Sequence, residues 1–382
     1  MNLKRLMPLL CTLALTITAC TPFSFFNRTT VSTEPHPTVS DGDPAPAPTG
    51  RSMRDVAVFY TEHEPGYPDS SDALSLHHDN MSSLIGFWYQ VDPVTFTVRS
   101  VYPPEVVAAS VARAKAYGLH TEMLVYNFLY GSTRTSTAVL ETLLTDSAAQ
   151  DTFVASLVDT ALQLEYDGVS IDFEHLKPSR RDAFSRLIER VAEAARAAGL
   201  SVSISVGAKT WDDPANGWAG GYDYARLGNA VDRLIVMTYD EHGYSSGPGP
   251  IASIGWVERV VRYVTSQVPS DKVLLGIAGY GFDWNRAGGR PRYLSHGQVE
   301  ALRQRVGAPL RWDAEANTPY FTYYDAHGNL HEVWFENADS TSWKLDLVDK
   351  YNLGGIALWR LGLEDPALWD VVGQKFVPVS RM

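Results

Sequence analysis

The sequence contains almost no cysteine. Cys11 and Cys20 are the only two among 382 residues. Because Cys11 lies in an N-terminal segment that we expect to be removed, no disulfide can form within the mature chain. A domain without disulfides depends on its hydrophobic core for stability. Hydrophobic residues make up 45% of the sequence, which is enough for one large core or two ordinary domains.

Positive charge is also scarce. The chain has 32 lysines and arginines against 44 aspartates and glutamates, so its net charge is -12 and its pI is near 5.3. Binding to nucleic acid or to anionic lipid by counterion release requires an excess of basic side chains. We therefore expect no nucleic-acid partner and no steering of acidic substrates by bulk charge.

Residue spacings typical of metal and cofactor sites are missing as well. The pair His77-His78 and the run Asp240-Glu241-His242 do not have the spacing of a recognisable metal site. The sequence shows no glycine-rich phosphate loop and no serine nucleophile elbow. We expect neither a metal nor a cofactor, and we interpret the acidic run as lining for a sugar cleft.

The N-terminal apolar run, Leu6 to Ile17, is too short to span a bilayer as a mature helix. Two basic residues precede it, which is typical of a cleavable secretory signal over residues 1–19. The segment ITAC, which ends at Cys20, resembles the bacterial lipobox and implies lipidation of that cysteine. We expect an extracytoplasmic protein anchored to the membrane by the lipid. The alternative is a secreted protein cut near Ala19.

Residues 20–52 are rich in proline, threonine, serine and aspartate and have little apolar periodicity. This composition predicts a flexible linker behind the lipidated cysteine. A chain of this length has a root-mean-square reach of about 30 Å. The linker would hold the following domain, residues 53–382, away from a membrane surface.

The rest of the chain alternates short apolar runs rich in β-branched residues with amphipathic helical stretches, which is typical of βα units around a parallel sheet. Eight runs read as strands: Asp55 to Tyr60, Leu84 to Tyr89, Thr121 to Tyr126, Gly168 to Phe173, Ser201 to Val206, Arg233 to Tyr239, Lys272 to Gly279 and Gly355 to Trp359. Between the fourth and fifth, a helix is predicted over Arg181 to Ala198, ending at Gly199. The sequence predicts an α/β fold, a (β/α)8 TIM barrel with its chemistry at the carboxyl ends of the strands.

The regular spacing fails once, between the seventh and eighth strands. This gap, at about residues 285–345, contains a helical stretch, His296 to Val306, and two strand-like pieces, Tyr320 to Tyr324 and Glu332 to Phe335. We predict a small α+β insertion that walls one side of the cleft. An edge excursion without a role in binding is the alternative.

The segment Tyr166 to Glu174, YDGVSIDFE, contains the fourth predicted strand. Side chains alternate between the two faces of a strand. We expect the polar residues Ser170, Asp172 and Glu174 to face the barrel lumen. The apolar residues Val169, Ile171 and Phe173 would then face the helices. Two carboxyls at a partly dry barrel mouth make each other harder to ionise, so one can keep its proton and act as a general acid. Two solvated acids ending an ordinary strand are the alternative reading.

This segment resembles the DGxDxDxE strand motif of glycoside hydrolase family 18, with Asp167, Gly168, Asp172 and Glu174 in matching places. The resemblance implies that Glu174 is the general acid and base and that Asp172 orients and stabilises the N-acetyl group of the substrate. The middle acidic position of the motif is Ser170 here. Chitinases of the family have an aspartate there that hydrogen-bonds its neighbour, so we expect Asp172 to be held differently.

Two further segments resemble motifs of the same family. Met237-Thr238-Tyr239-Asp240 resembles MxYD at the end of the sixth strand, which implies that Tyr239 hydrogen-bonds the N-acetyl carbonyl. GGIALW, ending at Trp359, resembles the eighth-strand segment whose tryptophan forms the floor under the reacting sugar, although core packing would also explain a single tryptophan. The complete set of expected sugar-binding residues is Asp167, Ser170, Met237, Asp240, Trp359, Lys209 and Glu241, with Trp211 as a further subsite candidate.

The resemblance covers nearly all of Asp55 to Asp365 and is strongest to the bacterial spore-cortex-lytic N-acetylglucosaminidase branch. The segments MTYDEHGYSSGPGPIASIGWVERV and KVLLGIAGYGFDW carry it. It implies a monomeric enzyme that hydrolyses β-linked N-acetylglucosamine in peptidoglycan, spore cortex or chitin, with retention and with assistance from the substrate's own N-acetyl group. Three alternatives are a chitinase, an inactive lectin-like lipoprotein, and an envelope lipoprotein whose barrel only scaffolds partners.

Overall fold

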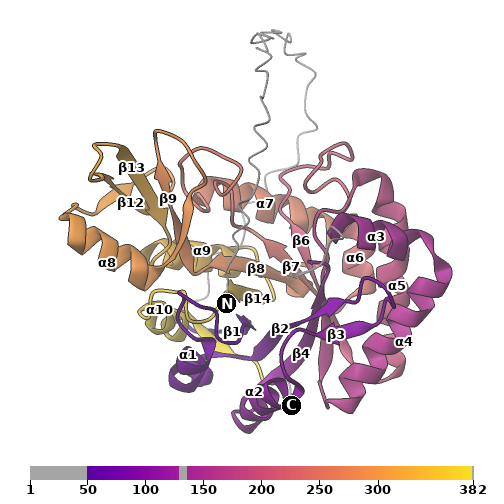
Figure 1. The fold of residues 1–382 in the computed structure, drawn as a ribbon. Helices are drawn as coiled ribbons and strands as arrows, with labels where there is room; N and C mark the ends of the chain where they lie inside the picture. Colours follow the sequence, from indigo (N-terminus) through magenta and orange to yellow (C-terminus); the bar gives the residue numbers. More distant parts are fainter. Residues whose placement is uncertain (1–49, 129–135, 381–382) are drawn as a thin grey trace, which may run out of the picture. The chain divides into compact units, whose positions relative to one another are not determined.

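The computed structural model describes residues 50–128 and 136–380 (Figure 1). The predicted signal segment, Cys20 and nearly all of the predicted linker lie outside the described residues. Among the described residues, no helix is long and apolar enough to cross a membrane.

Eight parallel strands form a closed barrel, as the sequence predicts. They are β1 (Ser52–Tyr60), β2 (Ser83–Val91), β4 (His120–Tyr126), β5 (Gly168–Asp172), β6 (Ser201–Gly207), β7 (Arg233–Met237), β8 (Val273–Ala278) and β14 (Gly355–Trp359). Strand β1 pairs with β14 on one side and β2 on the other, which closes the ring. Two short strands extend it, β3 (Val98–Ser100) beside β2 and β15 (Phe376–Pro378) beside β1. β5 and β7 end one and two residues earlier than predicted, where the chain leaves the barrel rim.

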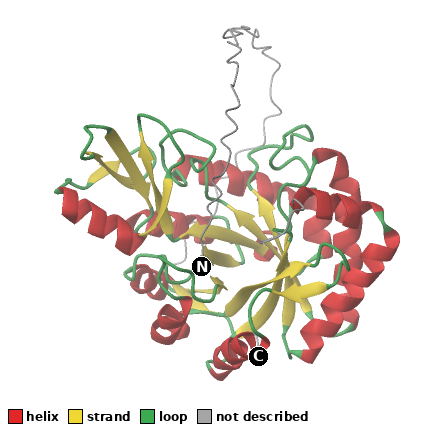
Figure 2. Cartoon of the chain, viewed as in Figure 1, coloured by secondary structure: helices red, strands yellow, loops and turns green. Residues whose placement is uncertain are grey.

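Helices cover the outside of the barrel (Figures 1 and 2). They are α1 (Ser70–His77), α2 (Pro104–Ala116), α3 (Ser136–Thr145), α4 (Ser147–Gln163), α5 (Arg181–Ala197), α6 (Tyr224–Ala230), α7 (Ile254–Gln267), α9 (Ala338–Lys350) and α10 (Leu368–Lys375), with 3-10 turns at His78–Asn80, Pro178–Arg180 and Ser270–Lys272. Helix α5 buries Phe184, Leu187 and Val191 against the sheet. Gly199 follows it with φ of 80°, a left-handed conformation that glycine adopts without strain and that commonly ends helices.

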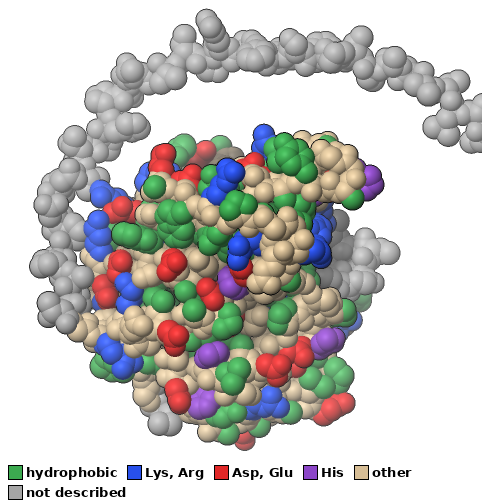
Figure 3. Space-filling view, turned by 90° about the vertical axis from the view of Figure 1, so that its left-hand side faces the viewer, with side chains coloured by type: hydrophobic (Ala, Val, Ile, Leu, Met, Phe, Trp, Pro, Cys, Tyr) green, Lys and Arg blue, Asp and Glu red, His purple; other side chains and the backbone are tan. Residues whose placement is uncertain are grey.

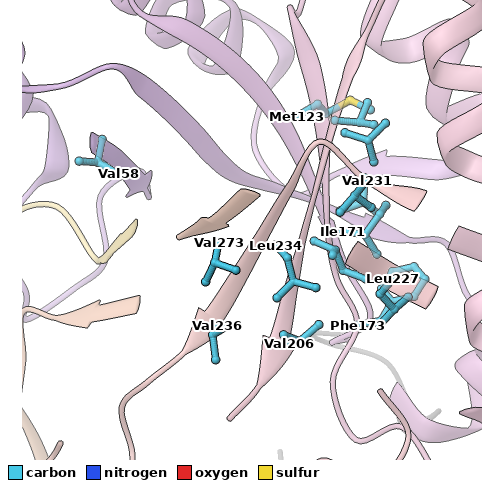
Figure 4. Close-up of a cluster of buried hydrophobic side chains, with 14 of the residues drawn as sticks. Val58, Met123, Ile171, Phe173, Val206, Leu227, Val231, Leu234, Val236 and Val273 are labelled. Carbon is cyan, nitrogen blue, oxygen red and sulfur yellow. The ribbon is translucent and has the colours of Figure 1, made fainter. Parts of the chain in front are cut away.

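The two faces of the barrel sheet have different neighbours. Val169, Ile171 and Phe173 pack in the large apolar core between strands and helices. Figure 4 shows Ile171 and Phe173 among their neighbours in this core. Ser170 and Asp172 lie on the other face, toward the lumen, so the predicted alternation is confirmed. A separate apolar cluster fills the middle of the lumen and includes Ile85, Leu124 and Leu274.

A buried charge cluster closes the amino-terminal end of the lumen. Arg233 donates a hydrogen bond to Asp55 at 2.5 Å and also donates to Glu122, while its Nη1 contacts Ser83. Burial alone would raise the pKa of Glu122, but the Arg233 guanidinium, together with His120 and Ser203, outweighs it and lowers this pKa to about 2. Glu122 therefore stays ionised beside the guanidinium. This cluster ties β1, β4 and β7 together beneath the apolar layer.

The insertion is a five-stranded antiparallel sheet with one helix. Its strand order is β10-β9-β13-β12-β11, and its elements are β9 (Tyr280–Asn285), β10 (Arg292–Ser295), α8 (His296–Val306), β11 (Arg311–Asp313), β12 (Thr318–Tyr324) and β13 (Leu330–Phe335). The predicted helix and both strand-like pieces are present. The sheet spans residues 280–335 rather than the expected range of about 285–345, because β9 follows β8 almost directly. Helix α9, after the insertion, packs against α7 and α10 of the barrel.

Acidic and basic side chains are interspersed over the face of the domain shown in Figure 3.

Candidate active site

A pocket of about 600 Å³ lies at the carboxyl ends of the barrel strands. Its size is in the range of small-molecule sites in proteins. It is lined by Thr61, His63, Glu64, Pro65, Phe87, Val101, Tyr102, Tyr126, Phe128, Asp172, Glu174, Met237, Tyr239, Trp359 and Arg360. The structure thus brings together members of all three motifs. Asp172 and Met237 end β5 and β7, Glu174 and Tyr239 follow two residues after them, and Trp359 ends β14.

Asp172 and Glu174 form the acidic part of the pocket. Asp172 is 5% exposed, and its buried Oδ1 atom has no hydrogen-bond partner within the described part of the chain. Burial raises the pKa of Asp172, and the hydroxyl of Ser205 opposes this rise. Burial, followed by the negative charges of Asp172 and Asp240, raises the pKa of Glu174 well above its ordinary value. The raised pKa favours the protonated form of the Glu174 carboxyl, the form that a general acid requires.

The backbone around Glu174 is held from two sides. Asn127 accepts a hydrogen bond from the Glu174 N–H at 2.9 Å and donates one to the Glu174 carbonyl at 2.8 Å. The Tyr222 hydroxyl donates to the carbonyl of Phe173 at 2.9 Å. Asn127 and Tyr222 are both buried. They are positioning residues, because they fix where the chain leaves β5 without reaching the carboxyl group.

Tyr239 supplies a hydroxyl to the same pocket. Burial and then the charge of Asp172 raise the pKa of Tyr239 well above its ordinary value, so the phenol stays protonated and can donate a hydrogen bond. The next residue, Asp240, has φ of 59° and accepts a hydrogen bond from Tyr280 at 2.5 Å. This contact comes from the first strand of the insertion.

The insertion supports the pocket from behind. The Tyr280 ring packs edge-on against Tyr239, with 6.2 Å between centroids. Tyr239, Tyr293 and Trp359 pack against one apolar cluster that includes Phe282. The lining of the pocket given above contains no residue of the insertion, and the insertion contacts the lining residue Tyr239 from behind through Tyr280. The wall that the sequence predicts stays a prediction.

Trp359 has a fixed orientation in the pocket. Phe59 and Phe87 contact its indole edge-on, at 5.3 and 5.2 Å between centroids. The peptide bond that follows Trp359 is cis, and Arg360 donates a hydrogen bond to Glu64 at 2.9 Å across the pocket lining. A fixed indole suits the apolar face of a pyranose ring. The predicted floor position is compatible with this geometry.

Two residues of the predicted strand motif lie away from the pocket. Asp167 precedes β5 at the amino-terminal end of the barrel, where its carboxylate accepts hydrogen bonds from the N–H and hydroxyl of Thr121, both at 2.8 Å. Ser170 is fully buried in the lumen and accepts a hydrogen bond from Ser203 at 2.8 Å. The structure therefore gives both residues internal contacts in place of the expected sugar contacts.

Two other predicted residues also have internal partners. Glu241 accepts a hydrogen bond from the Ser253 N–H at 2.7 Å, at the start of α7. Lys209 is buried and donates to Asp212 at 2.9 Å. Lys209 and Trp211 line a separate cavity of about 120 Å³. Asp240 and Glu241 thus differ in role, since only Asp240 influences the charge of Glu174.

Sequence reasoning missed several lining residues that strand alternation could have found. Phe87 and Tyr126 lie near the carboxyl ends of β2 and β4, and their rings stack at 4.1 Å between centroids. Tyr126 has the same lumen-facing parity as Leu124. Asn127 was harder to predict than Phe87 and Tyr126, because the only indication in the sequence was its position directly after a predicted strand.

Comparison with known proteins adds independent support to this geometry. The sequence profile of glycosyl hydrolases family 18 matches residues 131–364, a range that includes Asp172, Glu174, Tyr239 and Trp359. The cortical fragment-lytic enzyme of Bacillus subtilis (strain 168) is 34% identical over 244 residues, which are 63% of this chain and 56% of that enzyme. The chain thus spans somewhat more than half the length of this curated relative.

Two solved structures are similar over most of the chain. The spore cortex-lytic enzyme SleL of Bacillus cereus has a TM-score of 0.78 and 26% identity, covering 87% of this chain and 76% of that one. The chitinase of Chromobacterium violaceum ATCC 12472 has a TM-score of 0.77 and 32% identity, covering 84% of this chain and 98% of that one. The barrel thus has counterparts in both kinds of protein.

Proposed function

Because the chain belongs to glycosyl hydrolases family 18, we propose that this glycosidase cleaves β-linked N-acetylglucosamine in peptidoglycan, including spore cortex. The observation that carries the proposal is the pair of buried carboxyls, Asp172 and Glu174, in one pocket with Tyr239 and Trp359. The names of the cortical fragment-lytic and spore cortex-lytic relatives support the choice of polymer.

The proposed reaction retains the configuration of the sugar through substrate assistance. Protonated Glu174 gives its proton to the glycosidic oxygen, while the N-acetyl carbonyl oxygen attacks the anomeric carbon and the glycosidic bond breaks. The resulting oxazolinium ion is stabilised by the Asp172 carboxylate and by a hydrogen bond from Tyr239. The Glu174 carboxylate then removes a proton from a water molecule while the water oxygen bonds to the anomeric carbon. The bond between that carbon and the N-acetyl oxygen breaks at the same time, which restores the N-acetyl group. In this scheme the N-acetyl group replaces the second carboxylate nucleophile of other retaining glycosidases.

A second candidate is hydrolysis of chitin, favoured by the likeness to the Chromobacterium violaceum chitinase. The two candidates separate when the chain is incubated with defined muropeptides and with chitin oligomers and the products are identified by mass spectrometry. We expect muropeptide fragments cut on the reducing side of N-acetylglucosamine. Cleavage of chitin oligomers alone would establish the chitinase instead, and binding of both sugars without any cleavage would support a lectin-like protein.

The two raised carboxyl pKa values predict the pH dependence of hydrolysis. We expect a bell-shaped profile of kcat/KM in which both limbs lie above about pH 4, the range of ordinary carboxyls. Activity rises as the coupled pair loses its first proton and falls as Glu174 loses its own. Asp172→Asn removes a negative charge that raises the pKa of Glu174, so the alkaline limb of the residual activity should move to lower pH.

The measurement is the pH profile of both forms with a chromogenic N-acetylglucosaminide. An alkaline limb that stays in place in Asp172→Asn, or moves upward, would show that Asp172 does not control the proton on Glu174.

We further propose that the protein is an extracytoplasmic lipoprotein anchored through Cys20. The support is the signal-like sequence over residues 1–19 and the lipobox-like segment that ends at Cys20. Membrane fractionation tests the proposal, because Cys20→Ser should move the protein from the membrane to the soluble extracytoplasmic fraction. Equal membrane association of both forms would contradict it.

A further inference from the structure

A second hollow, separate from the active pocket, lies between the insertion and the barrel. It has a volume of about 420 Å³ and is lined by Trp312, Asn317, Asp339, Ser342, Trp343 and Asp346. None of these residues lines the active pocket. Trp312 belongs to β11, the edge strand of the insertion sheet, and Trp343 belongs to helix α9 of the barrel.

The two tryptophans are unusually accessible for their size. Trp312 is 39% exposed and Trp343 is 50% exposed. Single exposed aromatic residues are ordinary on protein surfaces, but a cluster of exposed apolar side chains in one hollow marks an interaction site. Tryptophan is also among the residues most enriched where proteins bind ligands, because its large apolar surface is left in water otherwise.

The remaining lining residues define the kind of ligand. Asn317 and Ser342 offer donors and acceptors, and the carboxylates of Asp339 and Asp346 accept hydrogen bonds from hydroxyl groups. The lining contains no lysine or arginine, and the nearby Lys375 donates to Asp346. An anionic ligand would be repelled by this lining. A neutral molecule with apolar ring faces and many hydroxyls or amides fits it.

The hollow is held in shape by rigid elements on both sides. Lys344 and Glu336 form a buried ion pair at 2.7 Å that ties α9 to the end of the insertion, next to Trp343. The Ile254 N–H, at the start of α7, donates to the Ala316 carbonyl at 2.9 Å beside the turn that carries Asn317. Little ordering is needed on binding, which lowers the free-energy cost of holding a ligand.

We propose that this hollow is a second carbohydrate-binding site that holds a stretch of N-acetylated polysaccharide outside the active pocket. The two indoles lie against the apolar faces of pyranose rings, and the amide, hydroxyl and carboxylate groups hydrogen-bond their substituents. The identity of the polymer rests on the proposed function. The site would keep the enzyme on an insoluble substrate between cleavage events.

Binding to insoluble peptidoglycan sacculi tests the proposal in an inactive Glu174→Gln background, so that the polymer stays intact. We expect Trp312→Ala together with Trp343→Ala to weaken binding about tenfold. Tyr324→Ala is a matched control, because Tyr324 is 70% exposed on β12 but does not line the hollow. Equal thermal unfolding midpoints would show that all the variants are folded.

The outcomes separate this site from the active pocket. With Glu174 restored, the double variant should lose more activity on sacculi than on a short chromogenic N-acetylglucosaminide. Unchanged binding to sacculi, with hydrolysis of the short substrate intact, would overturn the second site and leave the proposed function standing. Absence of hydrolysis from the wild-type protein on every substrate would overturn the proposed function itself.

Discussion

Glu174→Gln is expected to lower kcat for hydrolysis of an N-acetylglucosaminide by about 10² to 10⁴-fold. Glutamine has nearly the same shape but can neither give a proton to the leaving oxygen nor take one from water. The backbone hydrogen bonds from Asn127 do not involve the side chain, so the position of residue 174 is preserved. Initial rates with a chromogenic substrate, compared with binding of the intact sugar, measure the effect.

Glu189→Gln is the control for this substitution. Glu189 lies on α5, outside the barrel, and accepts a hydrogen bond from Arg226. The same chemical change there should leave kcat within about twofold, the effect expected of a surface substitution with little energetic consequence. A wild-type kcat for the Glu174→Gln variant would show that Glu174 takes no part in the catalytic step.

Arg233→Met is expected to lower the free energy of unfolding by about 3–5 kcal/mol. Arg233 is 2% exposed and lies between the carboxylates of Asp55 and Glu122 at the closed end of the lumen. Its removal leaves two negative charges buried without the guanidinium that compensates for their lost hydration. Urea unfolding of the two proteins, followed by circular dichroism, gives the difference.

Arg226→Met is the matched control. Arg226 also pairs with two acids, Asp182 and Glu189, but on the outside of the barrel. Exposed ion pairs contribute about 0–1 kcal/mol, so this variant should be close to wild type. Equal and small losses in both variants would mean that the lumen charges are hydrated and that the cluster does not hold the barrel closed.

The barrel could be predicted because its strands carry a local signal. The segment at Gly168–Asp172 has apolar residues on one face and polar residues on the other, and the structure places these faces as alternation requires. The first strand of the insertion, Tyr280–Asn285, was missed because its local signal merges with that of the preceding barrel strand. It follows Ala278 with only Gly279 between them, so one apolar run contains two strands of different sheets.

The motif match placed some residues correctly and others wrongly. Asp172 and Glu174 lie in the pocket as predicted, whereas Asp167 lies at the other end of the strand. Five residues of extended chain cover roughly 16 Å, so strand geometry alone argues against one pocket containing Asp167 and Asp172. A residue that matches a motif therefore need not line the pocket, because its place along the strand decides whether it can touch the substrate.

The contacts that tune the site depend on distant parts of the chain. Asn127 reaches Glu174 across 47 positions, and Tyr222 reaches Phe173 across 49. Ser205, which opposes the raised pKa of Asp172, comes from the neighbouring strand β6. Ser170, where the family motif has an aspartate, likewise bonds to Ser203 on β6. These pairings follow from the register of the barrel strands, which cannot be read from the sequence alone.

The anomeric configuration of the first product tests the central proposal most directly. Proton NMR during the first minutes of hydrolysis distinguishes a newly formed β-anomer from the equilibrium mixture. Substrate assistance at the Asp172–Glu174 pocket predicts the β-anomer as the initial product of a β-linked N-acetylglucosaminide. Initial release of the α-anomer would contradict it, because water would then have attacked directly, without the oxazolinium ion that Asp172 and Tyr239 are proposed to stabilise.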